Sequence, residues 1–192
     1  MKTVVVILVL LLLASVCAAQ SRTSDAAASR PSPTDTHRAK DERPCLFDFE
    51  RGEVPDCVRE NTAGQLCIAA QYLSELTFDA NGLATVLSHE KGWMYVNRKG
   101  KVLISGVARM DNGPDSFHDG LVRFVKNKKY GFANRKGQIV IPPIYDGALN
   151  FDNGVAKVCK GCQEKCAEAK CEHYFFDGGA WSSIDPKGDL VK

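Results

Sequence analysis

The sequence has little net charge, few histidines and, after its first residues, no long apolar run. Its formal net charge of +2 at pH 7 gives no overall attraction to nucleic acid or to acidic membranes. Beyond an apolar stretch at residues 4–13, nothing approaches the ~20 apolar residues that span a membrane. The four histidines show no metal-ligand spacing with one another, and the sequence has neither a glycine-rich phosphate loop nor a nucleophile elbow. We therefore expect no nucleic-acid partner, no membrane span, no cofactor and no enzymatic activity.

Residues 1–19 have the features of an export signal. Lys2 is the only charge before the apolar stretch, and small residues follow it, ending with Ala18 and Ala19. A positive start, a short apolar core and a small-x-small exit are typical of a secretory signal peptide. We expect cleavage after Ala19 and a mature protein that is periplasmic or secreted.

Residues 20–43 contain no aromatic and no large aliphatic residue. Such a segment cannot bury enough apolar surface to offset the entropy lost on ordering. We expect it to be a disordered polar linker, which places the folded domain at residues 44–192.

Internal similarity organises that domain. A Gly-x-apolar-x-Ile phrase follows Gly64, Gly100 and Gly137, and a weaker version follows Gly188. An Asn or Asp stands three residues before each glycine, at Asn61, Asn97, Asn134 and Asp185. Short β-branched and aromatic runs lie between Asn/Gly clusters, which predicts strands and tight turns. The fold class predicted is mainly β: an array of about four short three-stranded β-repeat units, arranged as a curved meander or solenoid or closed into a ring.

Residues 117–151 carry the most complete copy of this pattern. It reads Phe-x-x-Gly, then Tyr130-Gly131, then Asn-Arg-Lys-Gly-Gln-Ile-Val-Ile-Pro-Pro-x-Tyr-Asp from residue 134. This stretch resembles the WG β-repeat family. Other copies are degenerate, with Trp93-Met94 and Trp181-Ser182 where the family has Trp-Gly. The resemblance implies a β-rich repeat array of mainly bacterial exported proteins and no agreed biochemical activity.

The cysteines after residue 19 fall into two groups. In the first group, Cys57 and Cys67 flank a predicted turn, so we expect them to pair and leave Cys45 over. The second group lies in a polar insertion at about residues 159–176 of the last hairpin, predicted to be a loop without core residues of its own. An oxidising compartment favours disulfides, and four cysteines allow three pairings. The disulfide candidates are Cys57, Cys67, Cys159, Cys162, Cys166 and Cys171.

The alternative for the second group is a metal-binding or redox protein. Four thiolates with a histidine nearby have the composition of a structural zinc site. Its ligands would be Cys159, Cys162, Cys166 and Cys171, with His173 close by.

Basic residues recur at the predicted turns. In a stacked repeat, equivalent turns line up along one edge, so these residues are candidates for a positive binding edge; the alternative is that they are solvated turn tips. They are Arg98, Lys99, Lys101, Arg135, Lys136 and Lys187. The aromatic positions Trp93, Tyr130 and Trp181 are expected to pack between units, the alternative being a ladder that binds sugar or peptide. The function we expect is an exported binding or scaffolding module whose partner is a protein or a cell-envelope polymer.

Overall fold

The structure is a computed structural model, and it describes residues 45–46, 53–54, 57–110, 113–168, 171 and 173–191. The predicted signal peptide and linker, residues 1–19 and 20–43, lie outside the described residues. Within the described ranges, none of the helical structure is long and apolar enough to cross a membrane.

The described chain is mainly β-strand with one short 3-10 helix, η1 (Ala70–Glu75), so the predicted β fold is confirmed. The strands are β1 (Cys45–Leu46), β2 (Glu53–Val54), β3 (Val58–Glu60), β4 (Leu66–Ile68), β5 (Leu83–Ser88), β6 (Gly92–Asn97), β7 (Val102–Val107), β8 (Arg109–Met110), β9 (Gly113–Pro114), β10 (Leu121–Lys126), β11 (Lys129–Asn134), β12 (Ile139–Tyr145), β13 (Gly147–Ala148), β14 (Ala156–Lys160), β15 (Gln163–Cys166), β16 (Tyr174–Asp177), β17 (Ala180–Ile184) and β18 (Leu190–Val191).

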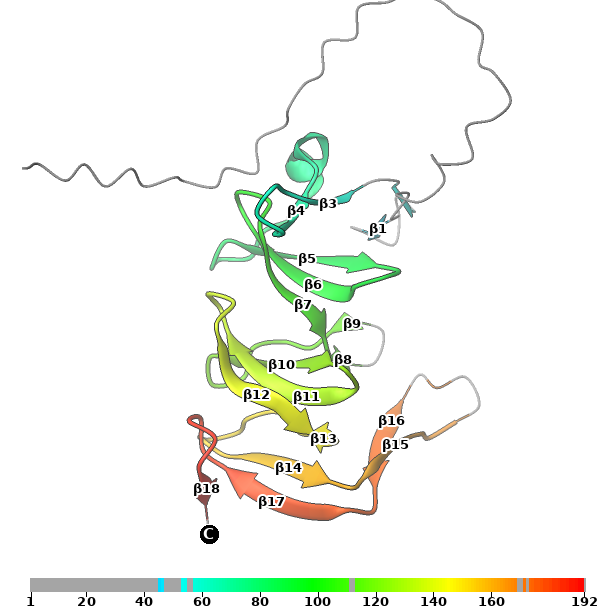
Figure 1. The fold of residues 1–192 in the computed structure, drawn as a ribbon, viewed down its shortest axis with the longest axis vertical. Helices are drawn as coiled ribbons and strands as arrows, with labels where there is room; N and C mark the ends of the chain where they lie inside the picture. The colour runs from blue at the N-terminus through cyan, green and yellow to red at the C-terminus, as the bar shows by residue number, and fades with distance from the viewer. Residues whose placement is uncertain are drawn as a thin grey trace, which may run out of the picture.

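These strands are stacked in layers along the long axis of the molecule (Figure 1). The first layer consists of β3, β4 and η1, the second of β5 to β7, the third of β10 to β12, and the fourth of β14, β17 and β18. In each of the last three layers the strands pair antiparallel in chain order. The first and fourth layers lie at opposite ends, so the stack is open and the ring-like alternative does not apply (Figure 1).

Two main sheets connect the layers. An eight-stranded sheet has the order β12-β11-β10-β7-β6-β5-β1-β2, so it includes all of the second and third layers. A four-stranded sheet has the order β13-β14-β17-β18 and forms the fourth layer. The second and third layers join through one paired position, Phe124 of β10 opposite Val107 of β7.

The same turn recurs in every layer. At Asn97 the side-chain Oδ1 accepts hydrogen bonds from the backbone N–H groups of Lys99 (3.0 Å) and Lys101 (3.1 Å), and the Gly100 N–H donates to the Asn97 carbonyl (2.9 Å). Equivalent bonds surround Asn61, Asn134 and Asp185. The glycines have φ of 74° at Gly64, 76° at Gly100, 79° at Gly137 and 91° at Gly188. The predicted equivalence of these turns is confirmed, and positive φ explains the glycine.

Each layer covers the outer face of the layer before it. Because strand side chains alternate between two faces, the middle layers have an inner face toward the preceding layer and an outer face toward the next. Between the second and third layers, Leu83, Tyr95, Ile104 and Val107 pack against Val122, Phe124 and Ala133. Between the third and fourth, Leu121, Tyr130, Phe132 and Ile141 pack against Ala156, Val158 and Ile184. The core is therefore a series of clusters between layers.

The turn glycines also touch the preceding layer. A Cβ atom added to Gly137 would lie 2.5 Å from the Leu103 carbonyl oxygen of β7, and one added to Gly100 would lie 2.7 Å from Leu73 Cδ2 of η1. At Gly188 the nearest atom, Ile141 Cγ1 of β12, would be 3.5 Å away. Glycine is thus needed at Gly137 both for positive φ and for close stacking on backbone, whereas the contact at Gly100 is with the end of a flexible leucine side chain.

The cysteine-rich insertion forms a hairpin, β15–β16, between β14 and β17. Phe176 packs against the core between the third and fourth layers and meets the Tyr130 ring edge-on at 5.3 Å between centroids. The Tyr174 hydroxyl donates to the Arg109 carbonyl at 2.7 Å. The prediction that the insertion lacks core residues is therefore wrong, because its aromatic side chains dock it onto the stack.

The first cysteine group pairs differently from our prediction. Cys57 is bonded to Cys45, so the expectation that it pairs with Cys67 and leaves Cys45 over is wrong. The physical reason is that β1 joins the sheet beside β5, which brings the Cys45 and Cys57 Cα atoms within 5.9 Å. In the β3–β4 pair, Cys67 stands opposite Arg59.

Candidate functional site

The basic turns lie on the same side of the stack in the second, third and fourth layers (Figure 1). Two of their arginines contact aromatic rings: the Arg98 guanidinium lies 5.0 Å from the Phe78 ring centroid, and that of Arg135 lies 4.3 Å from the Phe117 ring centroid. These cation–π contacts hold the turn tips onto their own layers. Four of the six basic side chains are exposed, and Lys101 and Arg135 are half-buried; the exposed ones are Arg98, Lys99, Lys136 and Lys187. Binding by this edge stays a prediction.

The three aromatic positions have different surroundings. Tyr130 is buried, and its hydroxyl donates to Glu164 Oε2 at 2.7 Å; burial, and then this bond, raise the pKa of Tyr130 well above its ordinary value. Trp93 is half-buried against the core between the second and third layers. Trp181 is 40 % exposed, and its Nε1 donates to the Gly178 carbonyl at 3.2 Å. Packing between layers is confirmed for Trp93 and Tyr130, whereas Trp181 lies on an uncovered layer.

The cysteines of the insertion are joined in two disulfides, Cys159–Cys162 and Cys166–Cys171. Of the two alternatives for these cysteines, disulfides and a zinc site, the structure has disulfides. Within the described ranges, no group of three or more His, Cys, Asp or Glu side chains is placed to hold a metal ion.

A buried ion pair links the layers and was missed by sequence reasoning. Asp115 is fully buried and Arg123 is 4 % exposed, and Arg123 Nε donates to Asp115 Oδ2 at 2.8 Å. Arg123 Nη1 donates to the Ala148 carbonyl at 2.7 Å, and the Tyr95 hydroxyl donates to the Asp115 carbonyl at 2.8 Å. The only local signal was an arginine inside an otherwise apolar strand, at residues 121–125. Complete pairing gives this network a structural role.

A cleft of about 730 Å³ lies between the second and third layers and the cysteine-rich hairpin. Its polar groups bind one another: Arg109 Nη2 lies 3.3 Å from Glu164 Oε1, and Tyr130 also binds Glu164. The Lys129 ammonium, followed by the Gly161 N–H, lowers the pKa of Asp146. Internal pairing therefore already satisfies most of the charge around this cleft.

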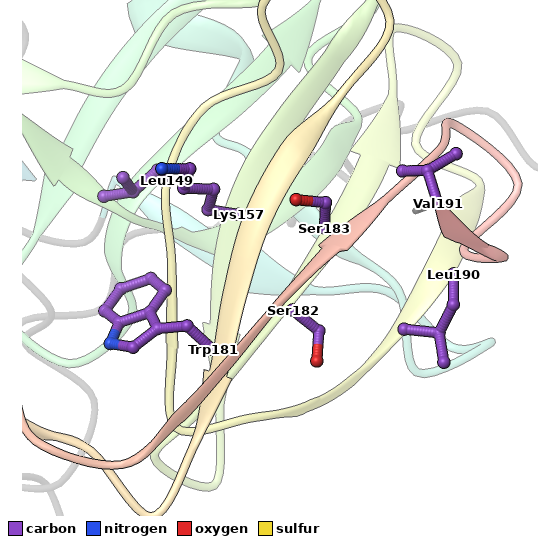
Figure 2. A pocket seen from close by; sticks show the side chains of 7 residues that line it. All are labelled: Leu149, Lys157, Trp181, Ser182, Ser183, Leu190 and Val191. Carbon is purple, nitrogen blue, oxygen red and sulfur yellow. The ribbon is translucent and has the colours of Figure 1, made fainter.

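A hollow of about 900 Å³ lies at the outer face and the β18 edge of the fourth layer. Its lining residues are Leu149, Lys157, Trp181, Ser182, Ser183, Leu190 and Val191 (Figure 2). Leu149 is 44 % exposed and Leu190 is 76 % exposed. Of the residues that the structure describes, every exposed large apolar one lies between 139 and 191. This face is the candidate functional site, and we call it the end face.

Strand register shows which residues of the third layer are equivalent to those of the end face. In the third layer Arg123 stands opposite Phe132, and in the fourth layer Lys157 stands opposite Ser183. Phe132 is 1 % exposed beneath the fourth layer, whereas Lys157 is exposed and Ser183 half-buried. Figure 2 shows Lys157, Ser183 and Trp181 along the same side of the sheet. The fourth layer thus repeats a core-forming face, but with serine in place of phenylalanine and with its charged side chain exposed.

A family model described as WG containing repeat matches residues 130–161. The match runs from β11 through β12 and β13 to the end of β14, so it bridges the third and fourth layers. It confirms the resemblance for this stretch. No curated protein matches the chain, and no solved structure matches it.

Proposed function

We propose that this chain, which carries a WG containing repeat at residues 130–161, is an exported binding or scaffolding module that docks a protein partner on its end face. The observation that carries the proposal is the concentration of exposed apolar side chains around a hollow on the fourth layer. Exposed apolar patches rimmed by polar residues are typical of interaction sites. A protein suits this face better than a cell-envelope polymer because the hollow combines leucine, valine and tryptophan side chains.

The same proposal treats the four layers as four repeat units. The recurrence of one Asn/Asp-x-x-Gly turn in each layer supports this count, as does the packing of inner faces on outer faces.

Export is supported by the sequence of residues 1–19 and by the disulfides, which persist in oxidising compartments. We propose no catalytic activity and no cofactor. The alternative role in metal binding would need free thiolates at the four cysteines that the two disulfides of the insertion occupy.

The test is selection of short random peptides displayed on phage against the immobilised mature protein. We expect peptides that the wild-type protein retains and the Trp181→Glu variant loses, because a carboxylate in the hollow disfavours apolar burial. Lys126→Glu, which changes an exposed side chain of β10 outside the end face, is the matched control and should bind like wild type. Far-ultraviolet circular dichroism checks that each variant is folded. Selected peptides that bind Trp181→Glu equally well would refute the proposal.

A further inference from the structure

We infer that the segment docking on the end face is an extended peptide in which a carboxylate lies next to an aromatic or large aliphatic side chain. This inference rests on the proposed function and names the chemistry of the partner. It follows from comparing two equivalent positions in neighbouring layers, one covered and one not.

The carboxylate follows from the position of Lys157. Its equivalent in the third layer, Arg123, is paired with Asp115, which stands two residues before Phe117. In the fourth layer the residue two before Phe151 is Leu149, so no carboxylate occupies that position. Lys157 is exposed at the rim of the hollow, beside Leu149 in Figure 2. A partner carboxylate would supply the charge that the chain itself supplies one layer earlier.

The apolar side chain follows from Ser183. In the third layer the same position holds Phe132, which packs against Phe151 with 4.8 Å between ring centroids. The smaller serine leaves the space between Trp181 and Val191, which stands opposite Ser183, without the ring that Phe132 supplies one layer earlier. A partner ring or aliphatic group would bury apolar surface there and meet the indole of Trp181 edge-on or offset.

An extended conformation fits the edge of the fourth layer. β18 ends the order of the four-stranded sheet, and no described strand pairs with its far side. A strand at the edge of a sheet can pair with an extended peptide through its backbone groups. Main-chain pairing at β18 would place alternate side chains of the peptide over the hollow.

A second copy of this chain fits the end face poorly. Two end faces packed symmetrically would place a Lys157 from each copy in one interface, and no lining residue of the hollow is a carboxylate that could pair with either. A head-to-tail contact would need exposed large apolar residues at the first layer, and the described residues before 139 have none. The partner is therefore a segment of different sequence.

The experiment extends the phage selection to sequence and charge. We expect the retained peptides to be enriched in Asp or Glu next to Phe, Tyr, Trp or Leu. The best peptide, made synthetically, should bind Lys157→Glu about tenfold or more weakly, since like charges then meet, while Lys126→Glu should bind it unchanged. Replacing its acidic residues with the matching amides should weaken binding to the wild-type protein.

Three outcomes separate the possible failures. Peptides that depend on Trp181 but lack acidic residues, and bind Lys157→Glu normally, would overturn this inference and leave the proposed function standing. Selection that yields no Trp181-dependent peptide would overturn both. A wild-type dimer in analytical ultracentrifugation that Trp181→Glu dissociates would identify a second copy as the occupant and overturn the inference.

Discussion

Replacing Gly137 with alanine tests whether the layers stack through their turns. Gly137 has a φ of 79°, and an added Cβ would lie 2.5 Å from the Leu103 carbonyl oxygen of the preceding layer. Gly154 is the matched control, because its φ is 80° and an added Cβ would meet nothing within 4 Å. The two substitutions therefore share the backbone cost and differ in the contact between layers.

The magnitudes follow from these two contributions. A left-handed conformation costs a residue with a Cβ atom about 1 kcal/mol or somewhat more, so Gly154→Ala should lower the free energy of unfolding by that amount. Gly137→Ala adds a clash with backbone that β6–β7 pairing holds in place, and overpacking of this kind costs about 1–3 kcal/mol. We expect a total loss of about 3 kcal/mol for Gly137→Ala.

The assay is urea unfolding followed by circular dichroism and by tryptophan fluorescence. Agreement between the two signals, together with unchanged dependence on urea concentration, validates the comparison of free energies. Equal losses for Gly137→Ala and Gly154→Ala would refute the argument that the turn of the third layer is fixed against Leu103.

Three further predictions concern burial and export. Arg123→Leu leaves a buried carboxylate unpaired and should lower the free energy of unfolding in urea by about 3–5 kcal/mol. Arg109→Leu breaks an exposed pair and should lower it by about 1 kcal/mol. Similar losses for the two variants would contradict the argument from burial. Burial raises the pKa of Tyr95 to about 12 and raises that of Tyr130, so near pH ~11 the native protein should contain fewer phenolates by ultraviolet absorbance than the protein in denaturant. Because the folded-state pKa values are raised, the stability these groups contribute is present below about pH 10 and is lost as the pH rises further; identical titration curves would contradict this. N-terminal sequencing of the exported protein should begin directly after Ala19, and retention of residues 1–19 would contradict the signal peptide.

The turns could be predicted from sequence because their chemistry is local. An Asn or Asp side chain that accepts backbone hydrogen bonds two and four residues later, with glycine at positive φ, is complete within five residues. The spacing of those turns then gave the β fold and the order of its hairpins. Residues such as Asn97 and Gly100 carry this information without reference to the rest of the chain.

The remaining features depend on contacts between distant residues. Cys45 reaches Cys57 because β1 pairs with β5, which no local spacing indicates. Phe176 docks on Tyr130 across the insertion, and Arg123 finds Asp115 only once the third layer is folded. Composition alone therefore made the insertion look like a polar loop.

The end face needed both kinds of information. The sequence identifies Trp181 as the counterpart of Tyr130, but whether such a residue is covered depends on where its layer lies in the stack. Register was also required to match Lys157 with Arg123 and Ser183 with Phe132. The site is visible only as a departure from the pattern of the preceding layer.

The placement of the disulfides has a mechanical consequence. The two bonds of the insertion join cysteines three and five residues apart, and Cys45–Cys57 lies at the first-layer end of the stack. Among the bonds that the structure describes, none crosses from the second layer to the third or from the third to the fourth. Tension along the stack would therefore meet only noncovalent contacts at these two boundaries. Under load the protein would extend in steps, one for each boundary between layers that opens, and it would shorten again when the layers repack.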